Sequence, residues 1–301
     1  MTVLSYRIQL RGCLVAAWMA CCGMIPLFAQ APRNIIQREL DSIFRGTADV
    51  AVVLDARDGH LLAVERKTEA GTMATAPGST LKPFFLSAAI QSGLVRPEFT
   101  VLCQRHLSIA GHDLACTHPA SQNIFNAEAA LAYSCNSYFA ELATRFSPQQ
   151  ATTTLRDYGF GNRTGLLSPE SSGAVRDPES QPETQLLVLG LKDVEVTPLQ
   201  LAHGYLVLSK QLAATPAVDR GLAESVSYGM AHNAATDGLP ISGKTGTASD
   251  PGRPWTHGWF AGIASLDRAK IIVVIYVPRG NGADAAQMAH RFFVQWERSS
   301  R

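Results

Sequence analysis

The sequence has few charged residues and almost no excess of either sign. Asp, Glu, Lys and Arg make up 17% of its 301 residues, and the formal net charge is +1 at pH 7. Nucleic-acid-binding domains usually carry a basic stripe, so this balance gives no support for a nucleic-acid partner. The hydrophobic share of 46% is ordinary for a globular protein. This length allows one large domain or two closely connected lobes.

Long hydrophobic runs are also lacking, except near the N-terminus. Arg7 and Arg11 precede an apolar run from Cys13 to Phe28, and Ala29-Gln-Ala31 follows as a small-x-small cleavage site. This order is typical of a secretory signal, and the run is short for a transmembrane helix, which needs about 20 residues. We therefore expect residues 1–31 to be a signal peptide or, if uncleaved, an N-terminal membrane anchor. The protein is then expected to work outside the cytoplasm, in the periplasm or cell envelope.

Cysteine is scarce outside that segment, where only Cys103, Cys116 and Cys135 remain. In an oxidising compartment, Cys103 and Cys116 can close a short loop as a disulfide. The same stretch also holds four further residues that can bind metals: His106, His112, Asp113 and His118. A zinc site is therefore the alternative, but the spacing matches no common zinc pattern. We prefer the disulfide and expect neither a metal nor a cofactor.

Several well-known catalytic motifs are absent from the sequence. It contains no H-E-x-x-H zinc motif, no phosphate-binding P-loop and no G-x-S-x-G nucleophile elbow. Gly159-Phe-Gly161 lacks the last glycine of a dinucleotide-binding loop and does not follow a predicted strand. The histidines show no pairing that suggests a Ser-His-Asp triad, and we expect His257 to lie on the surface.

Hydrophobic periodicity predicts strands near both ends of the chain and helices between them. Strands are predicted over 51–54, 61–65, 242–248, 258–265 and 270–277. Helices are predicted over 35–44, 79–90, 127–146 with an interruption near 134–136, 148–158, 197–208, 218–232 and 283–296, with loops over 94–122 and 165–183. One antiparallel sheet shared by the two ends, with the helical middle packed against it, would bury both sets of strands. The predicted fold class is therefore α/β, in the α+β sense.

Three short motifs carry the chemistry. Ser79 and Lys82 follow the turn at Pro77-Gly78 and open an apolar helical run. The second motif is S-x-N, which occurs at Ser121-Gln-Asn123 and at Ser134-Cys-Asn136, and the third is Lys244-Thr-Gly246. A lone serine and lysine at a helix start are more often an N-cap and a solvated cation. Three such motifs in this order instead indicate a serine acyl-enzyme.

Each motif has a part in acyl transfer. Ser79 would attack an amide carbonyl while a neutral Lys82 takes its proton, which requires burial or nearby cations to lower the pKa of Lys82. Ser134 would pass the proton to the leaving amine, and Asn136 would hold the substrate amide. Lys244 would repel a charged Lys82 and attract a substrate carboxylate.

Backbone groups complete the predicted site. Gly246 leaves a strand edge without a side chain, along which a peptide-like substrate can lie. The backbone N–H groups of Ser79 and Thr247 would form the oxyanion hole.

The motifs and their surroundings resemble the transpeptidase domain of penicillin-binding proteins. The segments that carry the resemblance are Ala51–Gly59, Pro77–Phe84, Tyr133–Phe139, Tyr158–Gly161, Val196–Ala202, Gly243–Ala248 and Gly258–Gly262. The resemblance extends over about Val50 to Val277, and it selects Ser134 over Ser121 as the serine of S-x-N. It implies a five-stranded antiparallel sheet flanked by helices, with an inserted helical subdomain, over a catalytic domain of residues 32–301.

The resemblance also implies an activity and a set of site residues. The catalytic residues would be Ser79, Lys82 and Ser134, and the substrate-binding residues would be Asn136, Lys244, Thr245, Gly246 and Thr247. The implied activity is that of a D,D-transpeptidase or D,D-carboxypeptidase acting on peptidoglycan stem peptides, with β-lactams as covalent inhibitors. No nucleic-acid partner is expected, membrane association would come through the N-terminal segment, and protein partners are unknown.

Two other functions share the acylation step. A β-lactamase would need a group that activates water, and Glu170 lies in the loop where such a glutamate is found, but the companion asparagine of that loop is missing. A sensor that stays acylated would normally connect to a transmembrane signalling domain, and no second apolar span is present.

Overall fold

The computed structural model describes residues 31–96, 98–250 and 252–300. The predicted signal peptide or membrane anchor at residues 1–31 lies, apart from Ala31, outside the described residues. Among the helices of the described residues, none has the length and hydrophobicity needed to cross a membrane.

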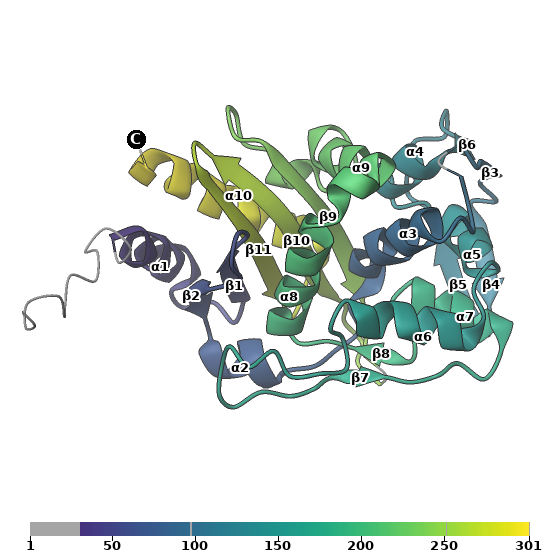
Figure 1. Ribbon diagram of the computed structural model, residues 1–301, viewed down its shortest axis with the longest axis horizontal. Coiled ribbons are helices and arrows are strands. Elements are labelled where there is room, and N and C mark those ends of the chain that lie inside the picture. Colours follow the sequence, from purple (N-terminus) through teal and green to yellow (C-terminus); the bar gives the residue numbers. More distant parts are fainter. Residues whose placement is uncertain (1–30, 97, 251, 301) are drawn as a thin grey trace, which may run out of the picture.

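The centre of the fold is a five-stranded antiparallel sheet that contains strands from both ends of the described chain (Figure 1). Its order is β2-β1-β11-β10-β9. The register of β1 on β11 runs from Val50 opposite Tyr276 to Asp55 opposite Ile271, and it joins the two ends of the chain. The predicted shared sheet is therefore confirmed. The strands are β1 (Val50–Asp55), β2 (Leu61–Glu65), β9 (Ile241–Ala248), β10 (His257–Leu266) and β11 (Ala269–Val277).

Helices cover both faces of this sheet. Ala51 and Val53 of β1 face a core shared with α1 (Ala31–Phe44) and α10 (Gly282–Ser300). The alternate residues Val50, Val52 and Leu54 face a second and larger core, to which α8 (Pro198–Ser209) contributes. Because both faces are covered, every residue of β1 is buried, and the strand is continuously apolar from Val50 to Leu54.

The second core extends into a helical lobe, which lies to the right of the sheet in Figure 1. The helix α3 (Lys82–Gln91) passes through its centre, and Phe84 packs edge-on against Tyr158, Phe160 and Tyr205. The remaining helices are α2 (Lys67–Thr72), which lies at the lower left in Figure 1, α4 (Ala127–Ala132), α5 (Asn136–Ala143), α6 (Pro148–Asp157), α7 (Gln181–Val188) and α9 (Pro216–Ser227).

Short strands and 3-10 turns complete the described chain. They are β3 (Val101–Leu102) with β6 (Ile124–Phe125), β4 (His106–Ile109) with β5 (His112–Ala115), and β7 (Ala174–Val175) with β8 (Val194–Glu195). The 3-10 turns are η2 (Gly78–Leu81), η3 (Leu212–Ala214) and η4 (His232–Ala234).

Three predicted boundaries were wrong. The α-helix near Ser79 begins at Lys82, because residues 78–81 form the 3-10 turn η2. The predicted loop over 94–122 contains the β4–β5 hairpin, whose turn uses Ala110 and Gly111 at positive φ. The predicted loop over 165–183 already includes the start of α7, which Ser180 caps through its side chain.

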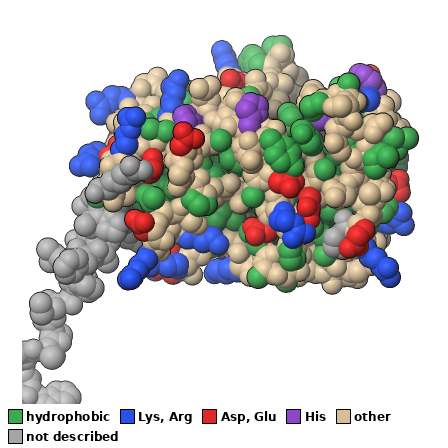
Figure 2. Space-filling view, turned by 90° about the horizontal axis from the view of Figure 1, so that it is seen from above, with side chains coloured by type: hydrophobic (Ala, Val, Ile, Leu, Met, Phe, Trp, Pro, Cys, Tyr) green, Lys and Arg blue, Asp and Glu red, His purple; other side chains and the backbone are tan. Residues whose placement is uncertain are grey.

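The surface reflects the balanced charge of the sequence. On the face shown in Figure 2, acidic and basic side chains are interspersed with hydrophobic and other groups. Charges interspersed in this way give that face no extended region of one sign that would attract a highly charged ligand.

Candidate active site

Ser79 lies on the 3-10 turn η2, directly before the buried helix α3. The backbone N–H of Lys82 donates to the carbonyl oxygen of Ser79. Upstream, Gly78 adopts a φ of 55°, and its N–H donates to the carbonyl oxygen of Gly190 at 2.9 Å. The turn therefore has a fixed backbone on both sides of the serine, whose own side chain is partly exposed.

Two buried side chains also hold this turn. His257 Nε2 and Trp259 Nε1 both donate to the carbonyl oxygen of Ala76, at 2.8 and 3.0 Å. His257 is only 2% exposed, so the expectation that it lies on the surface was wrong. It begins β10, where its ring reaches across the neighbouring strand β9 to the segment that precedes Ser79.

The strand β9, which carries Lys244-Thr-Gly246, lies directly against the turn. A β-carbon at Gly246 would be 2.4 Å from the carbonyl oxygen of Pro77, and one at Gly78 would be 2.8 Å from that of Thr247. Only glycine tolerates such close backbone approaches. The sequence predicted a glycine here because a substrate can lie along a strand edge without a side chain. The structure adds a second reason, because the turn that carries Ser79 packs directly on this strand.

Lys82 connects the first two motifs. Its side chain is fully buried, and Nζ donates to Ser134 O at 2.8 Å, to Ser134 Oγ at 3.1 Å and to Asn136 Oδ1 at 2.7 Å. A neutral amine has one lone pair, which can accept the hydroxyl proton of Ser134. Lys82 and Ser134 are therefore placed to exchange a proton.

Burial changes the protonation of both lysines in the site. It lowers the pKa of Lys82 to about 8, with the nearby Cys135 and Cys116 acting in the opposite direction. Burial also lowers the pKa of Lys244 well below its usual range, and the neighbouring Lys82 lowers it further. The predicted like-charge repulsion between the two lysines therefore contributes to the lowered pKa of Lys244.

Ser134 lies between α4 and α5 with a φ of 56°. This left-handed conformation is uncommon for a residue other than glycine, and such outliers cost roughly 1–3 kcal/mol and gather at functional sites. It ends α4 and lets α5 start at Asn136, so that the carbonyl and hydroxyl of Ser134 both face Lys82. The interruption predicted near 134–136 is confirmed.

The two threonines of the third motif have other partners. Thr245 Oγ1 donates to Met230 O at 3.2 Å, and Thr247 Oγ1 accepts from Gly282 N at 2.9 Å. Side chains alternate along a strand, so Thr245 points away from the face that carries Lys244. Lys244 Nζ donates to the carbonyl oxygen of Thr245 at 3.1 Å.

A known protein family matches most of the chain. The family described as penicillin binding protein transpeptidase domain matches residues 50–294. The chain belongs to this family. All three motifs lie within the matched residues. The first motif, at Ser79, and the third, at Gly246, are on elements that pack against each other. The second motif is joined to the first by hydrogen bonds from Lys82 to Ser134 and Asn136.

Curated relatives carry names of the same kind. The chain is 26% identical over 281 residues to "Peptidoglycan D,D-transpeptidase MrdA" of Acinetobacter baumannii, covering 73% of this chain and 42% of that protein. It is 27% identical over 297 residues to "Peptidoglycan D,D-transpeptidase FtsI" of Escherichia coli, covering 81% of this chain and 50% of that protein. The chain thus spans about half the length of these relatives.

Solved structures of penicillin-binding transpeptidase domains share the fold. The transpeptidase domain of penicillin-binding protein 3 from Burkholderia pseudomallei superposes with a TM-score of 0.78 at 19% identity, covering 90% of this chain and 94% of that chain. Pseudomonas aeruginosa PBP2, solved in complex with WCK 5153, gives a TM-score of 0.76 at 20% identity, covering 87% of this chain and 74% of that chain.

Glu170 of this penicillin-binding domain is occupied in holding its own loop. Its carboxylate accepts from the backbone N–H groups of Thr164 at 2.7 Å, Gly165 at 3.1 Å and Leu167 at 2.5 Å. Burial acts to raise the pKa of Glu170, but these hydrogen bonds outweigh it and the pKa is lowered. A carboxylate with a lowered pKa is a poor general base, which agrees with the absence of the companion asparagine from its loop.

The expected disulfide between Cys103 and Cys116 was wrong, because the structure has both as free thiols. Cys103 Sγ lies 3.2 Å from His118 Nε2, while Cys116 Sγ accepts from Asn136 N at 3.2 Å. Sequence reasoning missed that Cys135, the middle residue of S-x-N, joins the same cluster. The one hint in the sequence was the position of Cys135 inside the S-x-N motif.

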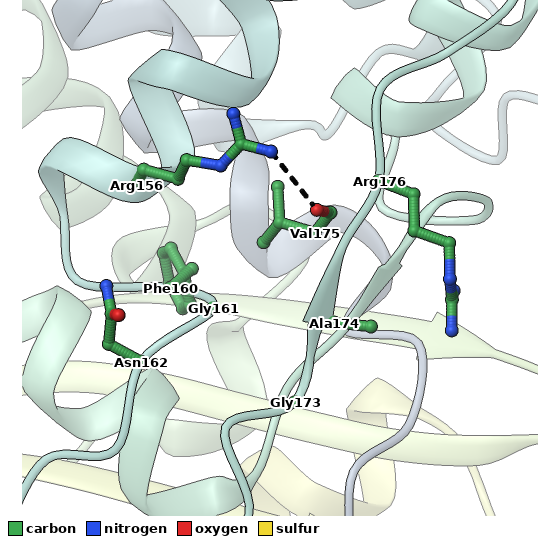
Figure 3. A pocket seen from close by; sticks show the side chains of 8 residues that line it. All are labelled: Arg156, Phe160, Gly161, Asn162, Gly173, Ala174, Val175 and Arg176. Carbon is green, nitrogen blue, oxygen red and sulfur yellow. Dashed lines mark hydrogen bonds between the residues drawn. The ribbon is translucent and has the colours of Figure 1, made fainter.

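A pocket elsewhere on the protein contains none of the motif residues. It lies between the end of α6 and β7, where Arg156 donates to Val175 O at 3.4 Å and Asn162 and Arg176 line the sides (Figure 3). It contains no nucleophile, and so it does not compete with the Ser79 region as a site of acyl transfer.

Proposed function

We propose that the protein is a serine D,D-transpeptidase or D,D-carboxypeptidase that acts on peptidoglycan stem peptides through an acyl-enzyme on Ser79. The observation that carries this proposal is the buried Lys82 amine, which bonds to both Ser134 and Asn136 one helical turn after Ser79. The printed names of the curated relatives support the same reaction class.

In the proposed first step, Ser79 Oγ forms a bond to the substrate carbonyl carbon and its proton passes to neutral Lys82. The N–H groups of Ser79 and Thr247 would donate hydrogen bonds to the carbonyl oxygen and stabilise the negative charge that develops on it. The C–N bond then breaks, and the proton moves from Lys82 through Ser134 to the leaving amine. An incoming amine would complete transpeptidation by attacking the ester, and water would complete carboxypeptidation.

Lys244 would recognise the terminal carboxylate of the substrate. Burial and the neighbouring Lys82 lower its pKa, which favours the neutral amine. A carboxylate next to it favours the ammonium form and would restore the charge. Asn136, whose Nδ2 donates to Ala115 O at 3.1 Å, would hold the substrate amide, with the edge of β9 on the other side.

The same proposal implies where in the cell the protein works. A chain that modifies stem peptides works outside the cytoplasm, which agrees with a signal or membrane tether at residues 1–31. Residues 32–301 would then form the catalytic domain, and β-lactams would acylate Ser79 as substrate analogues. The near-neutral charge of the sequence gives no support for a nucleic-acid partner.

A transfer assay tests this proposal. The full-length chain is incubated with a stem pentapeptide donor and an acceptor amine, and the products are identified by mass spectrometry. An exchanged peptide supports transpeptidation, and a shortened peptide alone supports carboxypeptidation. A Ser79→Ala variant should form neither product. If the wild type also forms neither but rapidly hydrolyses penicillin, the protein is a β-lactamase, and if it only stays acylated it is a sensor.

A further inference from the structure

A tryptophan with two arginines over its ring lies just past the end of β9. Arg279 Cζ is 4.4 Å from the ring centroid of Trp255, and Arg253 Cζ is 5.8 Å from it. Both arginines are exposed, and Trp255 is partly buried. A guanidinium stacked on a ring keeps its N–H groups free at the edge, where they can donate in pairs to a carboxylate. We call Arg253, Trp255 and Arg279 the Arg-Trp-Arg cluster.

Hydrogen bonds hold the two loops of this cluster beside the end of β9. Gly280 N donates to Thr256 O at 3.0 Å, and Thr256 Oγ1 donates to Gly280 O at 2.7 Å. A little further along the second loop, Gly282 N donates to Thr247 Oγ1 at 2.9 Å. The loops are therefore tied to each other and to Thr247, whose N–H belongs to the proposed oxyanion hole.

The positive charge of the cluster is only weakly compensated. Arg253 Nε lies 3.6 Å from Asp250 Oδ2, which is long for an ion pair, and the carboxylate of Asp250 also accepts from Thr75 Oγ1. Arg279 forms no ion pair with any other described residue. Two guanidinium groups therefore share one carboxylate, which already has another partner, and the cluster can bind a further anionic group.

The proposed alignment of the substrate directs the acyl donor toward this cluster. In that alignment the terminal carboxylate lies at Lys244 and the scissile carbonyl at the N–H of Thr247. Because residues of an extended peptide rise about 3.3 Å each, the residues before the scissile bond would continue past Ala248. Ala248 pairs with His257 across the two strands, and Trp255 lies two residues before His257. The cluster would therefore lie along the path of the residues that precede the scissile bond.

We propose that the Arg-Trp-Arg cluster binds a free side-chain carboxylate on the residue that precedes the terminal D,D-dipeptide of the acyl donor. This inference rests on the proposed function and extends it, since it selects stem peptides whose preceding residue carries an acid. The ring of Trp255 orients Arg279, whose guanidinium donates two N–H bonds to the carboxylate, and Arg253 adds a second positive charge. No bond is made or broken at the cluster, so these residues determine specificity and take no part in acyl transfer.

Two peptide donors that differ in one group give the first test. Both are stem pentapeptides with a 2-aminoheptanedioic acid residue before the terminal dipeptide, and its side-chain carboxyl is free in one and an amide in the other. The full-length chain is assayed for release of the terminal residue, and kcat/KM is compared between the donors. We expect the free acid to be preferred by about tenfold, which is the effect of one charge-assisted hydrogen bond at an exposed site. Equal kcat/KM values for the two donors would overturn the proposal.

Variants then assign this preference to the cluster. Arg279→Gln should lower the ratio of the two kcat/KM values to about one, and Arg279→Lys should retain part of it, because lysine keeps the charge without the planar stack. Arg268→Gln, which removes an exposed arginine from the turn between β10 and β11, should keep the full ratio. A stack that only stabilises the loop would instead lower the urea midpoint of Arg279→Gln and leave its ratio unchanged, and this result would contradict the assignment.

A pair of penicillins separates this inference from the proposed function. One has an acyl side chain that ends in a carboxylate, and the other has an amide in its place. The carboxylate should acylate Ser79 faster, and Arg279→Gln should remove the difference. If neither peptide is cleaved but this preference is found, the peptidase activity is wrong and the cluster assignment stands. If the wild type cleaves both peptides equally well, the cluster assignment is wrong and the proposed function stands. A wild type that neither penicillin acylates would overturn both.

Discussion

Lys82 is a fully buried lysine with three oxygen acceptors around its amine. Burial favours the neutral amine and lowers its pKa, while the nearby Cys135 and Cys116 favour the ammonium form and raise it. The outcome is a pKa of about 8, which is low for lysine and close to the working range of a general base. A basic role would explain why a buried lysine lies beside the hydroxyl of Ser134.

The pH dependence of acylation tests this view of Lys82. Below the pKa of about 8 the amine is protonated and accepts no proton from Ser79, so the rate of labelling by penicillin should rise with pH and level off above it. Lys82→Ala should lower the rate about 10²–10⁴-fold and remove this inflection. Lys210→Ala, at an exposed position, serves as the control. A wild-type rate that falls as pH rises would contradict a basic role for Lys82.

Glu170→Gln separates a structural carboxylate from a catalytic one. The substitution weakens the hydrogen bonds from Thr164, Gly165 and Leu167, so the free energy of unfolding should fall by about 1–2 kcal/mol. The rates of acylation and of adduct release should stay close to those of the wild type. Urea unfolding and adduct mass measure the two effects, with the exposed Glu179→Gln as control. A large loss of adduct release would instead assign Glu170 to deacylation.

At the scale of elements, the central contact is the one between β9 and the turn η2. Gly246→Ala would place a β-carbon 2.4 Å from Pro77 O and push the turn away from the strand. Because a misplacement of about 1 Å can cost on the order of 10²-fold in rate, we expect acylation of Ser79 to fall at least tenfold. Fluorescent penicillin labelling measures the change.

Gly93→Ala is the matched control for that experiment. Its β-carbon would meet nothing within 4 Å, although the residue has a φ of 71°. It should lose a little stability through its backbone and acylate at the normal rate. If Gly246→Ala acylates as fast as Gly93→Ala, the close packing of β9 on the turn is not what positions Ser79.

Elements with strong local signals were predictable from the sequence. Thr197 followed by Pro198 predicted the start of α8, and the structure shows a capping box there with Gln200. The start of α3 was misjudged, because a 3-10 turn and an α-helix share the same apolar spacing over four residues. The hairpin at 106–115 was missed since its strands are short and mostly exposed, without a clear alternation of apolar residues.

At the scale of the whole molecule, α3 links the sheet to the helical lobe. Phe84→Ala would remove contacts to Tyr158, Phe160 and Tyr205 and should lower the free energy of unfolding by about 3–5 kcal/mol. Urea unfolding should show a lower midpoint with an unchanged slope. Leu102→Ala, whose side chain is 65% exposed, should change stability by less than about 0.5 kcal/mol. A Phe84→Ala variant as stable as Leu102→Ala would contradict the central role of α3.

The site itself was only partly predictable. The order of the motifs indicated that Ser79, Lys82, Ser134 and Asn136 act together, and the hydrogen bonds of Lys82 show three of these in contact. What the sequence does not show is which side chains approach from distant segments. The buried ring of His257 on Ala76 and the convergence of Cys135 with Cys103 depend on packing between segments far apart in the chain.

Mass analysis of the acyl-enzyme tests the central claim most directly. The full-length chain is mixed with an excess of penicillin, and its intact mass is measured before and after digestion. We predict one penicilloyl group per chain, located on the peptide that contains Ser79 and absent in Ser79→Ala. Absence of an adduct on the wild type without hydrolysis of penicillin, or an adduct of the same extent on the variant, would contradict the account.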